Sequence, residues 1–168
     1  MSSESRDGLV YSHNFRRYFE DDNQTTIDML EQVLQFGILS PRKAKELGVP
    51  FKRDTNIFVT GVKNYDNIIF LFPENQPSHI PVWHDAVTIL LSTDMRVVTV
   101  EEMIRHQEGN WVVLSHLFGE VYRFGRISQR FFREIVLPSS PTSTLMQAKE
   151  MVKLYVPSMA EQIQVRTA

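Results

Sequence analysis

The sequence predicts a single α+β domain, with N-terminal helices, a central mixed and mostly antiparallel sheet, and a C-terminal helix. Its 168 residues suit one domain, and a content of 42% hydrophobic and 23% charged residues is typical of a globular chain. Helix-like patterns come first, strand-like runs follow and a helix-like pattern ends the chain. This order lacks βαβ alternation and therefore favours α+β over a doubly wound sheet. Residues 1–8 are expected to be a disordered lead-in, with the domain over 9–168.

The first third contains a short apolar stretch and two helices. Leu9-Val10-Tyr11 begins the domain and is followed by Ser12-His13-Asn14. Apolar residues then recur on one helical face, capped by Thr25 or Thr26 and stopped by Gly37. Ser40-Pro41 reads as an N-cap followed by proline at the first helical position, which predicts a second helix ending at Leu47.

The middle and end of the chain are predicted mainly as strands, because branched and aromatic residues gather in short runs. The expected strands are 57–60, 67–72, 87–91, 96–100 and 132–137. A short helix is expected over 101–107, a basic connector over 122–130 and an amphipathic helix over 145–155. The pattern at 111–117 fits either a strand or a helix.

Composition excludes several classes of function. The absence of cysteine excludes disulfides, thiolate zinc sites and a cysteine nucleophile. A net charge of −2 gives no global attraction to nucleic acid or anionic membranes. No segment approaches the ~20 apolar residues of a membrane span. Neither a P-loop nor a dinucleotide-binding glycine pattern is present.

Two histidines in a proline-containing loop are the candidates for a metal site. His79, His84 and Asp85 offer two imidazoles and a carboxylate. Pro81 lies between the histidines and prevents the helical i, i+4 spacing that helix-borne zinc sites use. Solvated loop histidines are therefore the stronger interpretation, and no metal is assigned.

Residues 122–133 interleave four arginines with four aromatic residues. Arginine binds phosphate through a planar fork, and aromatic rings stack on bases. This pattern allows a non-catalytic module that binds nucleic acid or a protein partner. The alternative is a strand with buried phenylalanines and solvated arginines.

Glu134 is the most suggestive acid, because it interrupts the apolar run 131–137. A carboxylate in such a place can orient a ribose hydroxyl or stabilise an oxocarbenium-like transition state. The competing interpretation is an acid that turns outward from an edge strand or pairs with an arginine.

Two regions of the chain resemble ADP-ribosyltransferase-like families, including DNA-targeting toxin enzymes. Near the start, Val10-Tyr11-Ser12-His13-Asn14 resembles the strand with a His-centred NAD-binding motif, and Phe36-Gly37-Ile38-Leu39-Ser40 resembles the later "Gly-Leu-Leu-Ser" pattern. Near the end, Glu134-Ile135-Val136-Leu137-Pro138 resembles the strand opened by the catalytic glutamate. The resemblance covers about forty residues at the start and ten near the end.

The resemblance implies an NAD-dependent mono-ADP-ribosyltransferase, with NAD as substrate. His13 and Asn14 would hold the nicotinamide ribose, with Thr60 in the same cleft. Tyr65 would stack on nicotinamide, and Glu134 would bind the ribose 2′-hydroxyl and stabilise the charge that develops as nicotinamide leaves.

The same resemblance leaves several points open. Arg42 or Arg133 would pair the pyrophosphate. The acceptor would be a protein side chain, a nucleobase or a nucleotide. A soluble, cytoplasmic toxin or injected effector is the expected context.

Overall fold

The computed structural model describes residues 10–16, 23–49, 63–74, 86–108, 120–138 and 140–167. The described chain has an α+β fold, as the sequence predicts. Its helices are α2 (Asn23–Phe36), α3 (Pro41–Leu47), α4 (Val100–His106) and α5 (Thr142–Tyr155), with 3₁₀ turns η1 (Tyr65–Asn67), η4 (Gln129–Phe131) and η5 (Pro157–Met159). Its strands are β1 (Val10–Arg16), β2 (Ile38–Leu39), β3 (Ile68–Glu74), β4 (Ala86–Leu91), β5 (Val121–Phe124), β6 (Arg126–Ile127), β7 (Phe132–Leu137) and β8 (Gln164–Thr167).

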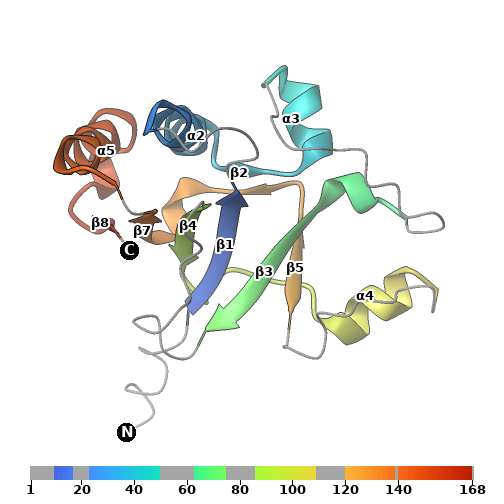
Figure 1. Cartoon of the computed structure of the whole chain (residues 1–168). Coiled ribbons are helices and arrows are strands. Elements are labelled where there is room, and N and C mark those ends of the chain that lie inside the picture. The colour runs from blue at the N-terminus through green and yellow to red at the C-terminus, as the bar shows by residue number, and fades with distance from the viewer. Residues whose placement is uncertain are drawn as a thin grey trace, which may run out of the picture.

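Six strands form the main sheet, in the order β5-β3-β1-β4-β7-β8 (Figure 1). Every neighbouring pair in this sheet is antiparallel except β7 and β8, which are parallel. β2 and β6 form a separate two-stranded pair. The sheet is therefore mixed and mostly antiparallel, in agreement with the prediction.

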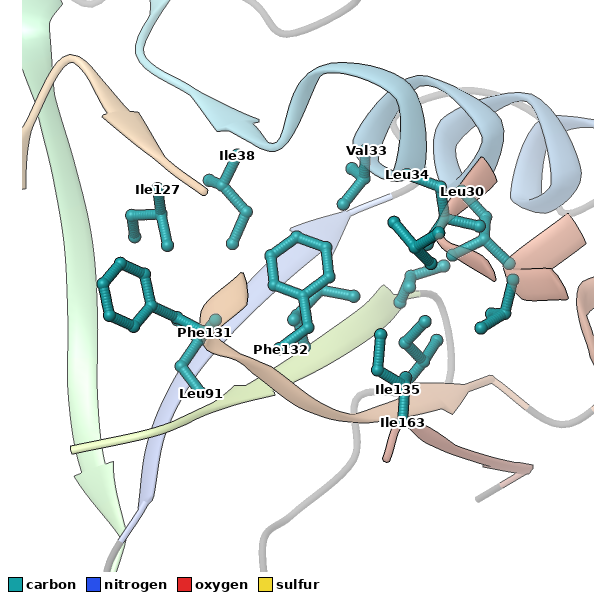
Figure 2. Close-up of a cluster of buried hydrophobic side chains, with 14 of the residues drawn as sticks. Leu30, Val33, Leu34, Ile38, Leu91, Ile127, Phe131, Phe132, Ile135 and Ile163 are labelled. Atoms are coloured by element: carbon teal, nitrogen blue, oxygen red, sulfur yellow. The ribbon is translucent and has the colours of Figure 1, made fainter. Parts of the chain in front are cut away.

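One face of the sheet is covered by α2 and α5, which lie side by side (Figure 1). Apolar side chains of α2 at helical spacing, including Leu30, Val33 and Leu34, pack against Phe132 and Ile135 of β7 (Figure 2). Full burial of each such side chain stabilises the fold by about 1.5–3 kcal/mol. This cluster is the main hydrophobic core of the described residues.

The opposite face carries α4 at the end of the sheet formed by β3 and β5. Met103 of α4 packs there against Ile68 and Tyr122, and all three are buried. Thr99 caps the helix by accepting a hydrogen bond from the Glu102 amide at 3.2 Å. The helix fixes the position of Tyr122, which matters for the site described below.

The strands β1 and β3 are paired over only part of their length. Their ladder joins Val10–Ser12 to residues 72–74, whereas the ladder between β1 and β4 continues to Arg16. Figure 1 shows β1 and β3 diverging beyond the paired end. From His13 onward, the described ladders thus leave β1 attached to β4 alone, and we call this place the β1–β3 split.

Three elements differ from the sequence-based expectation. The strand expected at 96–100 is a single bridge at Val98, because Thr99 and the acidic residues after it start α4 instead. The connector expected at 122–130 contains β5, β6 and η4. The end of the chain forms β8. Its sequence is polar and was not predicted as a strand, and it is held in extended form by parallel pairing with β7. The strand expected at 57–60 and the ambiguous segment 111–117 lie outside the described residues.

Gly37 allows the α2–β2 connection to pass close to β6. Its φ is +81°, and an added Cβ would lie well inside van der Waals contact with the Ile127 carbonyl oxygen. Gly48 also has a positive φ of +68° at the end of α3, but a Cβ there would meet nothing within 4 Å. A substitution at Gly48 therefore causes backbone strain alone, whereas one at Gly37 causes backbone strain and steric overlap.

We expect Gly37→Ala to destabilise the protein more than Gly48→Ala. Both substitutions incur the left-handed backbone cost of about 1–2 kcal/mol, and Gly37→Ala adds about 1–3 kcal/mol because β6 must move. Urea unfolding of the two variants measures the difference. Equal losses would show that β6 does not constrain this connection.

Candidate functional site

His13 lies at the β1–β3 split and is only 4% exposed. Its Nδ1 is 2.8 Å from the backbone carbonyl oxygen of Phe70 on β3. A carbonyl only accepts hydrogen bonds, so Nδ1 carries the proton. The bond therefore fixes both the orientation and the tautomer of a buried imidazole, as in sites that use histidine for binding or proton transfer.

Phe70 also organises the aromatic residues around it. Its ring packs edge-on against Tyr65 at 5.9 Å between ring centroids and against Tyr122 at 5.7 Å. Aromatic pairs prefer this edge-to-face geometry. Through Phe70, Tyr65 of η1 and Tyr122 of β5 thus lie in the same neighbourhood as His13.

Glu120 is a buried acid, although its spacing of four residues from His116 favoured a surface contact on a helix; His116 lies outside the described residues. It immediately precedes β5, is 3% exposed, and accepts a hydrogen bond from the Tyr122 hydroxyl at 2.9 Å. Tyr122 is fully buried. A buried carboxylate is costly unless polar groups compensate for lost hydration, so burial of this kind concentrates at functional sites. The available sequence signal was a glutamate directly before the strand Val121–Phe124.

These contacts place an imidazole on β1 and a carboxylate directly before β5, and β1 and β5 are the two strands that flank β3. Neighbouring strands lie about 5 Å apart, so β1 and β5 are separated by roughly 10 Å across β3. Phe70 connects them, since its carbonyl accepts from His13 and its ring touches Tyr122. Tyr65 and Glu120 lie on the Phe70 ring side of β3 and His13 lies on the other face, so Phe70 is the link between them. We call His13, Tyr65, Phe70, Tyr122 and Glu120 the split site.

Arg42 is held at the edge of this neighbourhood by η1. Its guanidinium donates to Asp66 at 2.5 Å and to Asn64 at 3.1 Å. The hydrogen bond to Asp66 raises the pKa of Arg42 above its ordinary value and keeps the side chain cationic. The start of α3 is also tied to η1 by the Ser40 hydroxyl, which donates to Asn67 at 2.8 Å.

Glu134 is not brought together with His13. The ladders pair His13 with Ile89 and Ile89 with Ile135, so these three side chains share one face of the sheet. Glu134 is adjacent to Ile135 and points to the other face. There it forms an ion pair with Arg166 of β8, which matches the alternative interpretation of an acid paired with an arginine.

The remaining predicted residues are placed as follows. Asn14 accepts a hydrogen bond from the Thr88 hydroxyl at 2.6 Å and follows His13 on β1. Arg133 donates to the carbonyl oxygens of Arg130 and Phe132, away from Arg42. Thr60, and the metal candidates His79, His84 and Asp85, lie outside the described residues. Within the described ranges, no group of three or more His, Asp or Glu side chains could hold a metal ion.

The aromatic residues of segment 122–133 are mostly part of the core. Tyr122, Phe131 and Phe132 are buried, and Phe124 is half-buried beside His106. The structure therefore favours the interpretation of buried aromatics with solvated arginines. Base stacking on these three buried rings is not available, whereas the guanidinium groups remain accessible to a ligand.

Comparison of the chain with protein-family models, curated proteins and solved structures finds no match. None of the helices in the described ranges has the length and apolar character that a membrane crossing requires.

We expect Tyr122→Phe to lower the free energy of unfolding by about 1–3 kcal/mol, because a buried carboxylate loses a hydroxyl donor. In a Glu120→Gln background the same change should cost only about 1 kcal/mol, since the hydrogen bond then joins neutral groups. Urea unfolding of the four proteins in this double-mutant cycle measures the coupling. A cost that is identical in both backgrounds would mean that the hydroxyl does not act on the carboxylate.

Proposed function

We propose that the chain is an NAD-consuming enzyme of the ADP-ribosyltransferase type, with the split site as its NAD site. The observation that carries the proposal is the chain of contacts from His13 through Phe70 and Tyr122 to Glu120. The sequence resemblance implies an imidazole on the first strand and Glu134 as the glutamate that opens a late strand; the proposal gives the role of that glutamate to the buried Glu120. The glutamate is Glu120 and not Glu134.

The chemistry needs a negative charge beside the nicotinamide ribose. When the bond from ribose C1′ to the nicotinamide nitrogen breaks, its electron pair goes to the nicotinamide ring and C1′ becomes oxocarbenium-like. A carboxylate held in a partly dehydrated site stabilises that charge. The acceptor nucleophile then bonds to C1′ and releases a proton. Glu120 has the burial and the fixed orientation that this role requires.

Other residues of the site fit the remaining parts of NAD. The His13 ring would orient the nicotinamide ribose, because its own orientation is fixed by Phe70. Tyr65 presents a flat ring beside Phe70 and would pack on nicotinamide. Arg42 is a permanent cation next to η1 and would contact the pyrophosphate if Asp66 shares it.

Glu134 is less suitable because its charge is already compensated. Arg166 pairs with it, and continuous ladders place it on the opposite face from His13. The ladders also place Tyr122, and Glu120 bonded to it, on the face opposite His13, because Ser12 pairs with Phe72 and Phe70 with Tyr122. Glu120 is preferred for its burial and for its connection to His13 through Phe70. The acceptor in this proposal is macromolecular, and the place of action is a cytoplasm that supplies NAD, as for a toxin or injected effector.

We expect Glu120→Gln to reduce nicotinamide release from NAD by at least about 100-fold, the loss typical of removing one charge-stabilising group. Glutamine keeps the shape and still accepts from Tyr122, so the fold should be retained. Glu134→Gln is the matched control and should keep most of the activity. Chromatographic quantification of nicotinamide, with circular dichroism of each variant, makes the comparison.

Two results would contradict the proposal. Loss of activity in Glu134→Gln with full activity in Glu120→Gln would show that Glu134 of β7 is the catalytic glutamate. Absence of both NAD binding by calorimetry and nicotinamide release in the unmodified protein would remove the NAD assignment altogether.

A further inference from the structure

Four arginines gather in the turn that connects β5 to β7. We call Arg123, Arg126, Arg130 and Arg133 the arginine turn. Arg126 and Arg130 are exposed, and the other two are half-buried. Among the described residues, none of the four forms an ion pair with a carboxylate, whereas Arg42 and Arg166 do.

The guanidinium groups of the arginine turn are held in place by contacts that leave their charge uncompensated. Arg123 donates to the Arg96 carbonyl oxygen at 2.6 Å, and its guanidinium carbon is 5.7 Å from the centroid of the Phe131 ring. Arg130 lies over the same ring at 4.5 Å. Arg133 donates to the Arg130 carbonyl at 3.2 Å. Such preorganisation reduces the entropy lost when a ligand is bound.

The surroundings of the arginine turn are polar. Three of the four large hydrophobic side chains that are exposed in the described residues lie on α3 and α5, at Leu47, Met146 and Leu154. The fourth, Phe36, follows Gln35, whose carbonyl accepts from Gln129, and is the single apolar side chain of this kind beside the turn. A protein partner normally needs an apolar or aromatic anchor at the centre of its interface. Nucleic-acid interfaces are instead polar and strongly positive, and most of their hydrogen bonds go to phosphate and sugar.

Asp94 is an acid that is connected to this surface through Ser92. Asp94 follows Ser92, whose amide donates to the Phe131 carbonyl at 2.8 Å, and the Asp94 carboxylate accepts from the Ser92 hydroxyl. A single exposed carboxylate does not neutralise four guanidinium groups. The local charge is therefore positive, although the whole chain has a net charge of −2.

We propose that the arginine turn binds the phosphate backbone of nucleic acid. Because Phe131 and Phe132 are buried, the contact is made by guanidinium forks alone and is insensitive to base sequence. This proposal does not depend on NAD chemistry, since it concerns a different set of residues and is tested by binding alone.

The test is fluorescence anisotropy with a labelled single-stranded oligodeoxynucleotide of mixed sequence, titrated at several salt concentrations. The Arg126→Gln/Arg130→Gln variant should bind at least about tenfold more weakly at low salt. The slope of log K against log salt should fall in magnitude by about 0.7 for each phosphate that the variant no longer neutralises. Lys149→Gln/Lys153→Gln removes the same charge from exposed positions of α5 and should bind like the unmodified protein.

Several outcomes would overturn the proposal. They are an equal loss in the arginine and lysine variants, no binding by the unmodified protein, and a strong preference for one base sequence. Equally tight, arginine-dependent binding to phosphatidylserine vesicles would assign the surface to a membrane instead. Circular dichroism checks the fold, and the single Arg126→Gln variant removes only a contact to Gln129, so a weakened complex there is not explained by unfolding.

Discussion

The side chain of His13 connects β1 to β3 where the backbone pairing between these two strands ends. Backbone pairing between β1 and β3 stops after Ser12, and groups beyond that point need other partners because buried backbone polar groups are costly when unpaired. His13 satisfies the Phe70 carbonyl with its imidazole. Since β1 stays bonded to β4 through Arg16, this one hydrogen bond fixes the relation between the two halves of the sheet where the ladder does not.

The buried carboxylate of Glu120 is less favourable for stability than an apolar side chain at the same position. An apolar side chain at Glu120 would pack against Tyr122 without the cost of burying a charge. The chain instead keeps a carboxylate, and the hydroxyl of a fully buried tyrosine is committed to it. Glu134 shows the opposite case, an acid whose charge is matched by Arg166 and which stabilises the β7–β8 edge. Glu120 is 3% exposed whereas the Glu134 side chain is 18% exposed, and this deeper burial is the physical reason for preferring Glu120.

The sequence predicted those parts of the fold that local chemistry determines. Ser40 and Pro41 specified the start of α3, and the apolar run 132–137 specified β7 to the residue. Parts that depend on distant partners were missed. β8 is polar and forms only because β7 lies beside it. Val98 forms a single bridge and no strand, because Thr99 after it caps α4.

Prediction of the candidate site followed the same division. His13 was identified from its local pattern, and Tyr65 is brought near it through Phe70. The sequence alone does not choose between Glu120 and Glu134, because each lies near the start of a strand in the last third of the chain. The register, which is a tertiary property, places Glu134 and the Tyr122–Glu120 pair on the face opposite His13, and burial separates the two acids. The rings of segment 122–133 became core for the related reason that alternation turns Tyr122 inward and leaves Arg123 on the other side.

That alternation also separates Glu120 from the arginine turn, whereas His13 lies on the same face as Arg123. Glu120 and Tyr122 point to one face of β5, whereas Arg123 between Tyr122 and Phe124 points to the other and reaches Phe131. A polyanion on the arginine turn therefore neutralises charge without approaching the buried carboxylate. Binding there would change the association rate and the lifetime of the complex, and both depend on salt. A charge that develops at a ribose would instead be stabilised in a buried site, where salt screens charges much less. A macromolecular acceptor for the proposed enzyme would be held by the arginine turn and modified near Glu120, on the other face of the sheet.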